Sequence, residues 1–178
     1  YSQIPVQDYM YGAMENTSAT IFGDYLLTDK REALTREYLS VNIHELAHQW
    51  FGDMVTARSP WGGWLQEGFA SYYPKRFILE TQGQDAYEWV QYNQEVRSLR
   101  ATERNPRPIV HPLSGRRIYY KGSFVVEMLR DVVGDKAFRR GIHHYLTEHQ
   151  FANASTRDFY QAFQDTLGYT LEWFFTQW

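Results

Sequence analysis

The stretch VNIHELAHQWFGD, residues 41–53, contains the pattern that decides the fold prediction. His44 and His48 are four residues apart, so on a helix they project from one side, one turn along the axis and about 40° apart around it. That spacing lets two imidazoles reach one metal ion. Glu45 lies off their stripe and is placed to take a proton from a water molecule. The alternative is an ordinary helix, because HExxH also occurs by chance.

A helix that carries these residues is predicted from about Asp29 to about Phe51, with its end at Gly52, because Asp29 and Glu32 resemble a capping pair. Most of its faces are apolar, so it should be largely buried. A glutamate and two histidines on a buried helix are costly unless something pairs with them, and one divalent cation would compensate all three. The main apolar stripe consists of Leu39, Ile43, Leu46, Ala47 and Trp50.

Glu67 is the predicted third ligand. It follows His48 after 18 intervening residues, near the start of a second helix expected from about Trp64 to Thr81. A hydrolytic zinc needs three protein ligands and an open position for water. The chain has no cysteine, so histidines and carboxylates must hold any metal. The alternative is a solvated glutamate near a helix start. Small neighbours should allow close helix approach; they are Gly68, Ala70 and Ser71.

Composition limits the remaining classes of function. The chain has 178 residues, enough for one domain with a substantial core. Its 18 basic and 21 acidic residues give no sign of a nucleic-acid partner. No stretch approaches the roughly 20 apolar residues of a membrane span, and the amino end lacks the layout of a signal peptide. The sequence does not indicate a cellular compartment. The start at Tyr1 suggests a piece of a longer protein.

The remaining elements are expected to be a small amino-terminal sheet and further helices. Strands are predicted at Ala19–Phe22 and Tyr25–Leu27, and everything after residue 28 should be helix or loop. Pro74 should kink or split the second helix, which ends near Gly83. Ser155 and Asp158 form the clearest capping box. The later helices are expected at 84–101, 119–133, 135–149, 156–167 and 171–177, with a loop at Thr102–Ile118.

Together, HExxH, 18 residues, and Glu-Gly-Phe-Ala resemble the gluzincin aminopeptidases of the aminopeptidase N family. A second segment is similar to that family's G-A-M-E-N motif, whose glutamate binds the free α-amino group of the substrate. The resemblance therefore implies this role for Glu15, and a fixed carboxylate suits an ammonium group. By itself the segment could also be a polar turn. Its residues are Gly12, Ala13, Met14, Glu15 and Asn16.

A third segment, Tyr119 to Gly122, is similar to the family's Y-x-K-G motif. The first tyrosine of that motif donates a hydrogen bond to the oxyanion that forms beside zinc, which implies Tyr119 and not Tyr120. A phenol suits this role because it is a neutral donor. Without the resemblance, both tyrosines would be read as ordinary aromatics of the core or surface.

The resemblance covers nearly the whole chain and implies an α+β, mainly helical, thermolysin-like zinc peptidase domain over residues 1–178, with a small amino-terminal β-sheet. It implies one zinc ion, held by His44, His48 and Glu67, and release of amino-terminal residues from peptides with a free amino terminus. Family members also carry amino- and carboxy-terminal domains that this chain lacks. Three alternatives stay open: a zinc endopeptidase, a lipid-epoxide hydrolase, and a fragment that binds zinc or peptide without turnover.

The sequence also departs from the family pattern. Gln66 and Asp53 stand where many relatives have asparagine, Asn42 stands where a small or apolar residue is common, and Gly62 with Gly63 replaces a more acidic stretch. None of these positions is expected to touch a proposed ligand or catalytic residue, so they leave only substrate preference open. Four histidines match no motif and are expected in surface or loop positions: His111, His143, His144 and His149.

Overall fold

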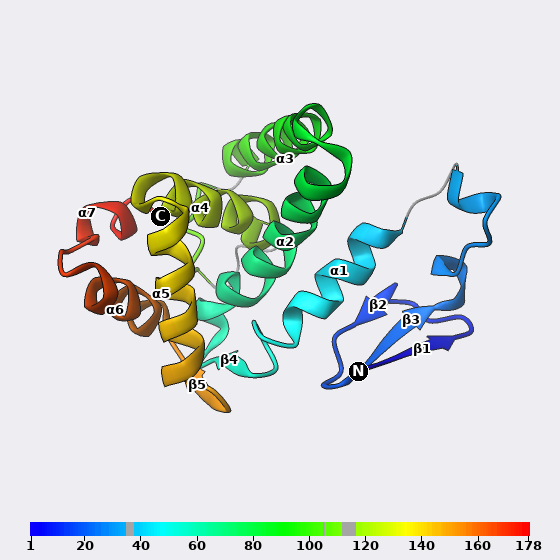
Figure 1. Cartoon of the computed structure of the whole chain (residues 1–178), viewed down its shortest axis with the longest axis horizontal. Helices are drawn as coiled ribbons and strands as arrows, with labels where there is room; N and C mark the ends of the chain where they lie inside the picture. The colour runs from blue at the N-terminus through cyan, green and yellow to red at the C-terminus, as the bar shows by residue number, and fades with distance from the viewer. Residues whose placement is uncertain (35–37, 105, 112–116) are drawn as a thin grey trace.

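The computed structural model describes residues 1–34, 38–104, 106–111 and 117–178. As predicted, the chain is mainly helical with a small amino-terminal sheet (Figure 1). The strands are β1 (Ser2–Val6), β2 (Ala13–Met14), β3 (Ala19–Gly23), β4 (Val55–Ala57) and β5 (Ala152–Ala154). The α-helices are α1 (Leu39–His48), α2 (Trp64–Gln82), α3 (Gln84–Arg104), α4 (Arg117–Val133), α5 (Asp135–Glu148), α6 (Thr156–Leu167) and α7 (Glu172–Phe175). Short 3-10 helices lie at Asp24–Leu26, Glu32–Leu34 and Pro60–Gly62.

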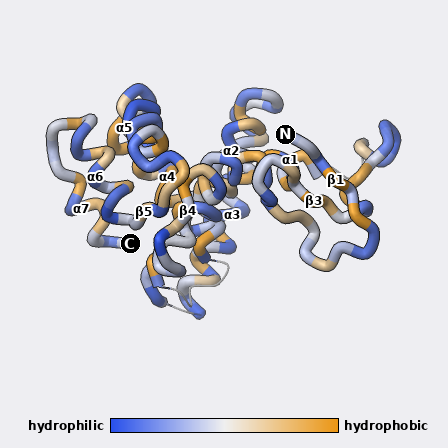
Figure 2. The backbone as a smooth tube through the Cα atoms, turned by 90° about the horizontal axis from the view of Figure 1, so that it is seen from below, coloured by the Kyte–Doolittle hydropathy of each residue, from blue (hydrophilic) through white to orange (hydrophobic). Residues whose placement is uncertain are grey.

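The amino-terminal sheet has the strand order β1-β3-β2. β1 runs parallel to β3, with Ile4 opposite Ile21, and β2 runs antiparallel to β3, with Ala13 opposite Phe22. In Figures 1 and 2 the sheet lies on one side of the molecule and α2 to α7 form a helical body on the other, with α1 between them. β2 is therefore an edge strand next to α1, which leaves its outer backbone groups without a strand partner in the described sheet.

The helical body has one continuous core. It is built from the inward faces of α2, α4, α5 and α6, and its aromatic side chains stack on one another: the rings of Phe51 and Phe69 are parallel with centroids 4.1 Å apart. Burial of such side chains is the main stabilising contribution to a fold of this size. Several side chains of this core are fully buried, including Phe69, Val126, Phe159, Phe163 and Leu171.

α1 is shorter and more open than predicted. It begins at Leu39, and the carboxylate of Asp29 instead accepts hydrogen bonds from the backbone of Arg31 and Glu32, at the start of a short 3-10 turn. Residues 35–37 of the predicted helix lie outside the described residues. The apolar stripe is also not fully covered: Leu39 and Trp50 are exposed. Its middle lines a hollow of about 350 Å³ against α5.

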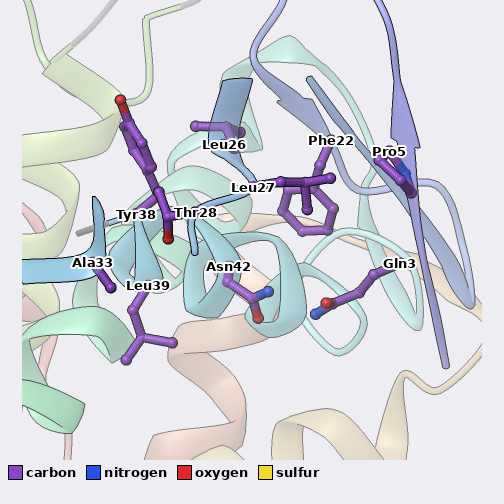
Figure 3. A pocket seen from close by; sticks show the side chains of 10 residues that line it. All are labelled: Gln3, Pro5, Phe22, Leu26, Leu27, Thr28, Ala33, Tyr38, Leu39 and Asn42. Atoms are coloured by element: carbon purple, nitrogen blue, oxygen red, sulfur yellow. The ribbon is translucent and has the colours of Figure 1, made fainter. Parts of the chain in front are cut away.

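A cavity of about 530 Å³ separates the sheet from the start of α1 (Figure 3). Pro5 and Phe22 line it from the sheet, and Leu39 and Asn42 line it from α1. The sheet therefore does not pack tightly against the first turn of the helix.

α2 is continuous from Trp64 to Gln82, so Pro74 does not split the helix, and the alternative that it kinks the helix stays a prediction. The helix ends where expected, at Gly83, whose φ of 90° favours glycine. α6 begins at the predicted capping box: Ser155 Oγ accepts from the backbone of Asp158, and the Asp158 carboxylate accepts from the backbone of Ser155. Strong local signals therefore fixed these boundaries.

Three further expectations need correction. Residues 24–26 form a 3-10 turn, not a strand, because the N–H of Leu27 donates to the carbonyl of Asp24. β4 and β5, which were not predicted, pair in parallel across almost 100 residues. The expected loop 102–118 is shorter, since α3 continues to Arg104 and α4 begins at Arg117; residues 105 and 112–116 lie outside the described ranges. None of the described helices has the length and apolar composition of a membrane span.

Candidate metal centre

Three predicted ligands converge between α1 and α2. The Nε2 atoms of His44 and His48 lie 3.2 Å apart. Oε2 of Glu67 lies 3.3 Å from Nε2 of His44 and 3.4 Å from Nε2 of His48. Two imidazole nitrogens and one carboxylate oxygen, all facing one point, form a donor set of the kind that holds a divalent cation in metallohydrolases.

His48 is held in the orientation that such a ligand needs. Its Nδ1 donates a 2.9 Å hydrogen bond to the backbone carbonyl of Phe51, and in the neutral imidazole this leaves the lone pair on Nε2. Gly52 makes this contact possible: its φ is 137°, and a Cβ there would lie 3.2 Å from Nδ1 of His48. The turn after α1 is therefore built around this imidazole, which is 1% exposed.

Glu67 provides the negative charge of the cluster. Its Oε2 is buried and has no hydrogen-bond partner of good geometry in the described residues. Burial by itself raises the pKa of Glu67, but its contacts with His44 and His48 lower it to about 2. Burial by itself lowers the pKa of His48, and contact with Glu67 raises it to about 9. Both shifts have the same cause, the attraction between this carboxylate and positive charge beside it, and a divalent cation would supply such charge.

Glu45 faces the same space without joining this donor set. It is 7% exposed, and burial raises its pKa to about 7 although the neighbouring histidines lower it. A carboxyl group whose pKa lies near neutrality can both accept and release a proton, as a general base must.

Tyr119 lies over the centre, whereas Tyr120 does not. The Tyr119 hydroxyl donates a 2.9 Å hydrogen bond to Oε1 of Glu67, and its ring is parallel to that of His44 with centroids 6.0 Å apart. Burial, together with the charge of Glu67, raises the pKa of Tyr119, so the phenol stays protonated and remains a donor. Tyr120 instead accepts a hydrogen bond from Arg97 of α3.

A contact between two glycines sets the position of Tyr119. A Cβ on Gly68 would lie 2.9 Å from the carbonyl carbon of Gly122, and a Cβ on Gly122 would lie 3.0 Å from Cα of Gly68. The close approach expected around Glu67 is therefore present, but it joins α2 to α4. It brings Tyr119, one turn before Gly122, onto Glu67, which precedes Gly68.

Glu15 approaches the centre from the sheet. Carboxylate oxygens of Glu15 and Glu45 and a ring nitrogen of His48 all lie within 4.8 Å of one another. Glu15 directly follows the edge strand β2, which contains Ala13 and Met14. Gly12, with φ of 85°, precedes the strand, and its carbonyl accepts a hydrogen bond from Gly23 of β3.

Two residues near the centre were not expected to matter. Gln49 bonds to the backbone on both sides of the turn after Glu15. Asp53 lies close enough to Glu15 and His48 to interact with both: burial, followed by the charge of Glu15, raises its pKa, while His48 lowers it. The backbone N–H of Asp53 also donates a 3.0 Å hydrogen bond to the carbonyl of His48, and the carbonyl of Gly63 accepts one of 3.1 Å from Glu67. The expectation that no departure from the family pattern touches a proposed ligand is therefore wrong for Asp53 and Gly63. The one sequence signal for Asp53 is that an acidic residue follows the HExxH helix closely.

A hollow of about 410 Å³ opens beside the metal centre. His44 and Tyr119 line it on the side of the centre, and Ser71 and Gln94 line it farther out. Outside the centre, His143 is exposed on α5, and His144 and His149 are partly exposed, in agreement with their expected surface positions. His111 is partly exposed in the segment after α3.

The family comparison is decisive for classification. The Peptidase family M1 domain matches residues 1–178. The chain belongs to peptidase family M1. The M1 domain is 30% identical to "Probable aminopeptidase 1" of Sulfurisphaera tokodaii, over 98% of this chain and 24% of that protein. It is 31% identical to "Tricorn protease-interacting factor F2" of Thermoplasma acidophilum, over 93% of this chain and 23% of that protein. It thus spans about a quarter of the length of these relatives.

Solved structures agree with this assignment. The M1 domain matches the M1 zinc metallopeptidase of Deinococcus radiodurans with a TM-score of 0.74 and 25% identity, over 94% of this chain and 36% of that chain. A mutant of that metallopeptidase bound to a Tyr-Ser-Ala substrate gives a TM-score of 0.75 and 28% identity, over 95% of this chain and 36% of that chain.

Proposed function

We propose that this M1 domain is the catalytic domain of a zinc-dependent aminopeptidase, part of a larger protein, which releases single amino-terminal residues from peptides. The observation that carries the proposal is the position of Glu15. Its carboxylate reaches the His48 side of the metal centre from the sheet, on an element separate from the helices that carry the donor set. An endopeptidase has no need of a second fixed carboxylate there, whereas an aminopeptidase must bind an ammonium group.

The donor set supports zinc as the cofactor. His44, His48 and Glu67 would hold one ion, and two histidines with one glutamate are a ligand combination of catalytic zinc sites. Zinc supplies Lewis-acid polarisation of the substrate carbonyl and of water in such hydrolases. The buried Oε2 of Glu67, without a hydrogen-bond partner of its own among the described residues, fits this assignment.

Three other side chains complete the proposed mechanism. Glu45 accepts the proton of the attacking water and delivers it to the leaving amine, for which a pKa of about 7 is suitable. Tyr119 donates a hydrogen bond to the substrate carbonyl oxygen as negative charge develops on it. Glu15 pairs with the ammonium group, and this fixes cleavage after the first residue.

The edge strand provides the rest of the peptide site. β2 pairs with β3 on one side only, so its outer backbone groups can add an extended peptide as a further strand. In this proposal Gly12, Ala13, Met14 and Asn16 bind substrate through the backbone and hold Glu15 at its end. The relatives are about four times as long as this domain, and in this proposal the remainder of a longer protein completes the peptide site.

The decisive experiment compares Glu45→Gln with the unchanged protein on a panel of aminoacyl chromogenic amides, each offered with a free and with an acetylated amino group. Loss of the general base should lower kcat by about 100- to 10,000-fold. Zinc content should stay at one ion per chain, because Glu45 is not a ligand. Glu148→Gln, at the exposed end of α5, is the matched control and should leave kcat unchanged.

The outcomes separate the alternatives. Equal cleavage of the acetylated amides would favour an endopeptidase over an aminopeptidase. Tight binding of one zinc without turnover that depends on Glu45 would mean that the isolated chain only binds zinc, and that the longer protein is needed for catalysis.

A further inference from the structure

The side chain of Gln49 joins the end of α1 to the turn that follows Glu15. Its Oε1 accepts a 2.7 Å hydrogen bond from the backbone N–H of Ser18, and its Nε2 donates a 3.3 Å hydrogen bond to the backbone carbonyl of Glu15. One amide group thus uses its acceptor on one end of the Glu15–Ser18 segment and its donor on the other. These contacts span 31 and 34 positions of sequence.

The turn needs such support. Ser18 has a φ of 63°, in the left-handed region that residues other than glycine adopt infrequently. The turn closes with a 2.9 Å hydrogen bond from the N–H of Ala19 to the carbonyl of Asn16, but its side chains at Asn16 and Ser18 are exposed. A strained, exposed turn keeps one conformation only where surrounding interactions hold it.

At its other end, α1 is separated from the amino-terminal sheet by a cavity. At the first turns of α1, a cavity of about 530 Å³ lies between Leu39 and Asn42 on the helix and Phe22 on the sheet. Gln49 lies at the opposite end of α1 and immediately follows the predicted ligand His48. The backbone that carries a metal ligand therefore carries, in the next residue, the contact to the Glu15 turn.

We propose that Gln49 is a positioning residue that fixes the Glu15 carboxylate relative to the metal centre and so sets the preference for substrates with a free amino group. This inference rests on the proposed function, in which Glu15 binds the substrate ammonium group. Asp53 lies on the same side of the turn, and its carboxylate contacts the side chains of Thr17 and Gln49, although its buried Oδ2 has no hydrogen-bond partner in the described residues. Gln49 differs from Asp53 because its side chain bonds directly to the backbone at both ends of the Glu15–Ser18 segment.

The test replaces Gln49 with methionine, which keeps the length of the side chain but loses both hydrogen bonds. Gln161→Met is the matched control, because among the described residues Gln161 makes a local hydrogen bond, to Asp165 on the exposed surface of α6. The first measurement is amide hydrogen exchange across residues 12–19. Exchange of the Ser18 amide should rise about tenfold in Gln49→Met, the effect of losing one hydrogen bond, and stay unchanged in the control.

The second measurement is the ratio of kcat/KM for an aminoacyl amide to that for its acetylated form. This ratio should fall about tenfold in Gln49→Met, mainly through the free-amine substrate, with zinc content unchanged. Binding of leucine amide and of N-acetyl-leucine amide, measured by calorimetry in the Glu45→Gln background, gives the same comparison without turnover. Gln49→Ala repeats the test if the methionine variant does not fold.

Two results would overturn the positioning role: an unchanged exchange rate at Ser18, or faster exchange with an unchanged preference for the free amino group. Failure of the proposed function looks different. In that case the unchanged protein itself shows no preference for leucine amide, while the exchange rates still report whether Gln49 holds the turn.

Discussion

In the helical body, α2, α4, α5 and α6 share one core, whereas most side chains of β1 and β2 are exposed and the sheet meets the body along α1. The proposed metal ligands and general base lie on α1 and α2. The proposed ammonium anchor, Glu15, lies on the sheet side. In this proposal the groups that hold the cation belong to helices that pack against each other. The group that selects the substrate is instead attached through a few specific contacts, such as those of Gln49.

The largest expected effect compares one apolar residue from each region. Phe159 of α6 is fully buried, and Ile4 of β1 is 44% exposed. Phe159→Ala should lower the free energy of unfolding by about 3 to 5 kcal/mol, and Ile4→Ala by less than about 1 kcal/mol. Urea unfolding monitored by circular dichroism measures both. Similar losses in the two variants would contradict the assignment of stability to the helical body.

An intermediate effect is expected where α2 crosses α4. In Gly68→Ala the new Cβ would meet the backbone of Gly122 at 2.9 Å, so the helices must separate. The free energy of unfolding should fall by about 1 to 3 kcal/mol, and activity should fall because Tyr119 moves away from Glu67. Gly63→Ala is the control: its Cβ would make an ordinary 3.6 Å contact with Ile118. Equal stability of the two variants in urea would show that the crossing of α2 and α4 can accommodate an added Cβ, which would contradict this prediction.

The smallest effect concerns the capping box of α6, a surface feature of the body. Although burial raises the pKa of Asp158, the Ser155 backbone and hydroxyl and the charge of Arg58 lower it below its ordinary value. The unfolded chain therefore binds this proton more readily. Stabilisation is complete above the unfolded pKa of about 3.9 and is lost as pH falls through the folded pKa.

Asp158→Asn should accordingly cost about 1 kcal/mol at pH 7 and progressively less below pH 4. Thermal unfolding of the variant and of the unchanged protein, measured at pH 7 and below pH 4, gives the difference in their free energies of unfolding. Asp131→Asn, at an exposed position of α4, should show no such pH-dependent difference. A constant difference at all pH values would mean that the carboxylate charge does not contribute to the cap.

Features with a local signal were predictable from the sequence. The start of α6 followed from Ser155 and Asp158, and the end of α2 followed from Gly83. The convergence of His44, His48 and Glu67 could be anticipated because helical spacing fixes two of the three positions and the family resemblance supplies the third. The structure brings these residues together with Glu45, Tyr119 and Glu15, and their catalytic roles stay predictions.

Features that depend on distant partners were missed. Asp29 caps only one short turn, and nothing in its neighbourhood distinguishes that from the start of a long helix. β4 and β5 are three residues each and pair across almost 100 positions, so neither has a recognisable strand pattern. The role of Gln49 has no local signal in the sequence, because its hydrogen-bond partners belong to a turn about 30 residues earlier.

The contact between Gly68 and Gly122 couples two sequence motifs that are distant in the chain, so that each motif constrains the evolution of the other. A substitution at either glycine changes the constraint on the other, so the two positions should be exchanged between homologous proteins only as a pair. The same holds for protein engineering. A copy of this centre grafted onto another scaffold requires α2 and α4 as one block, with their backbones in contact, before its ligands can be placed.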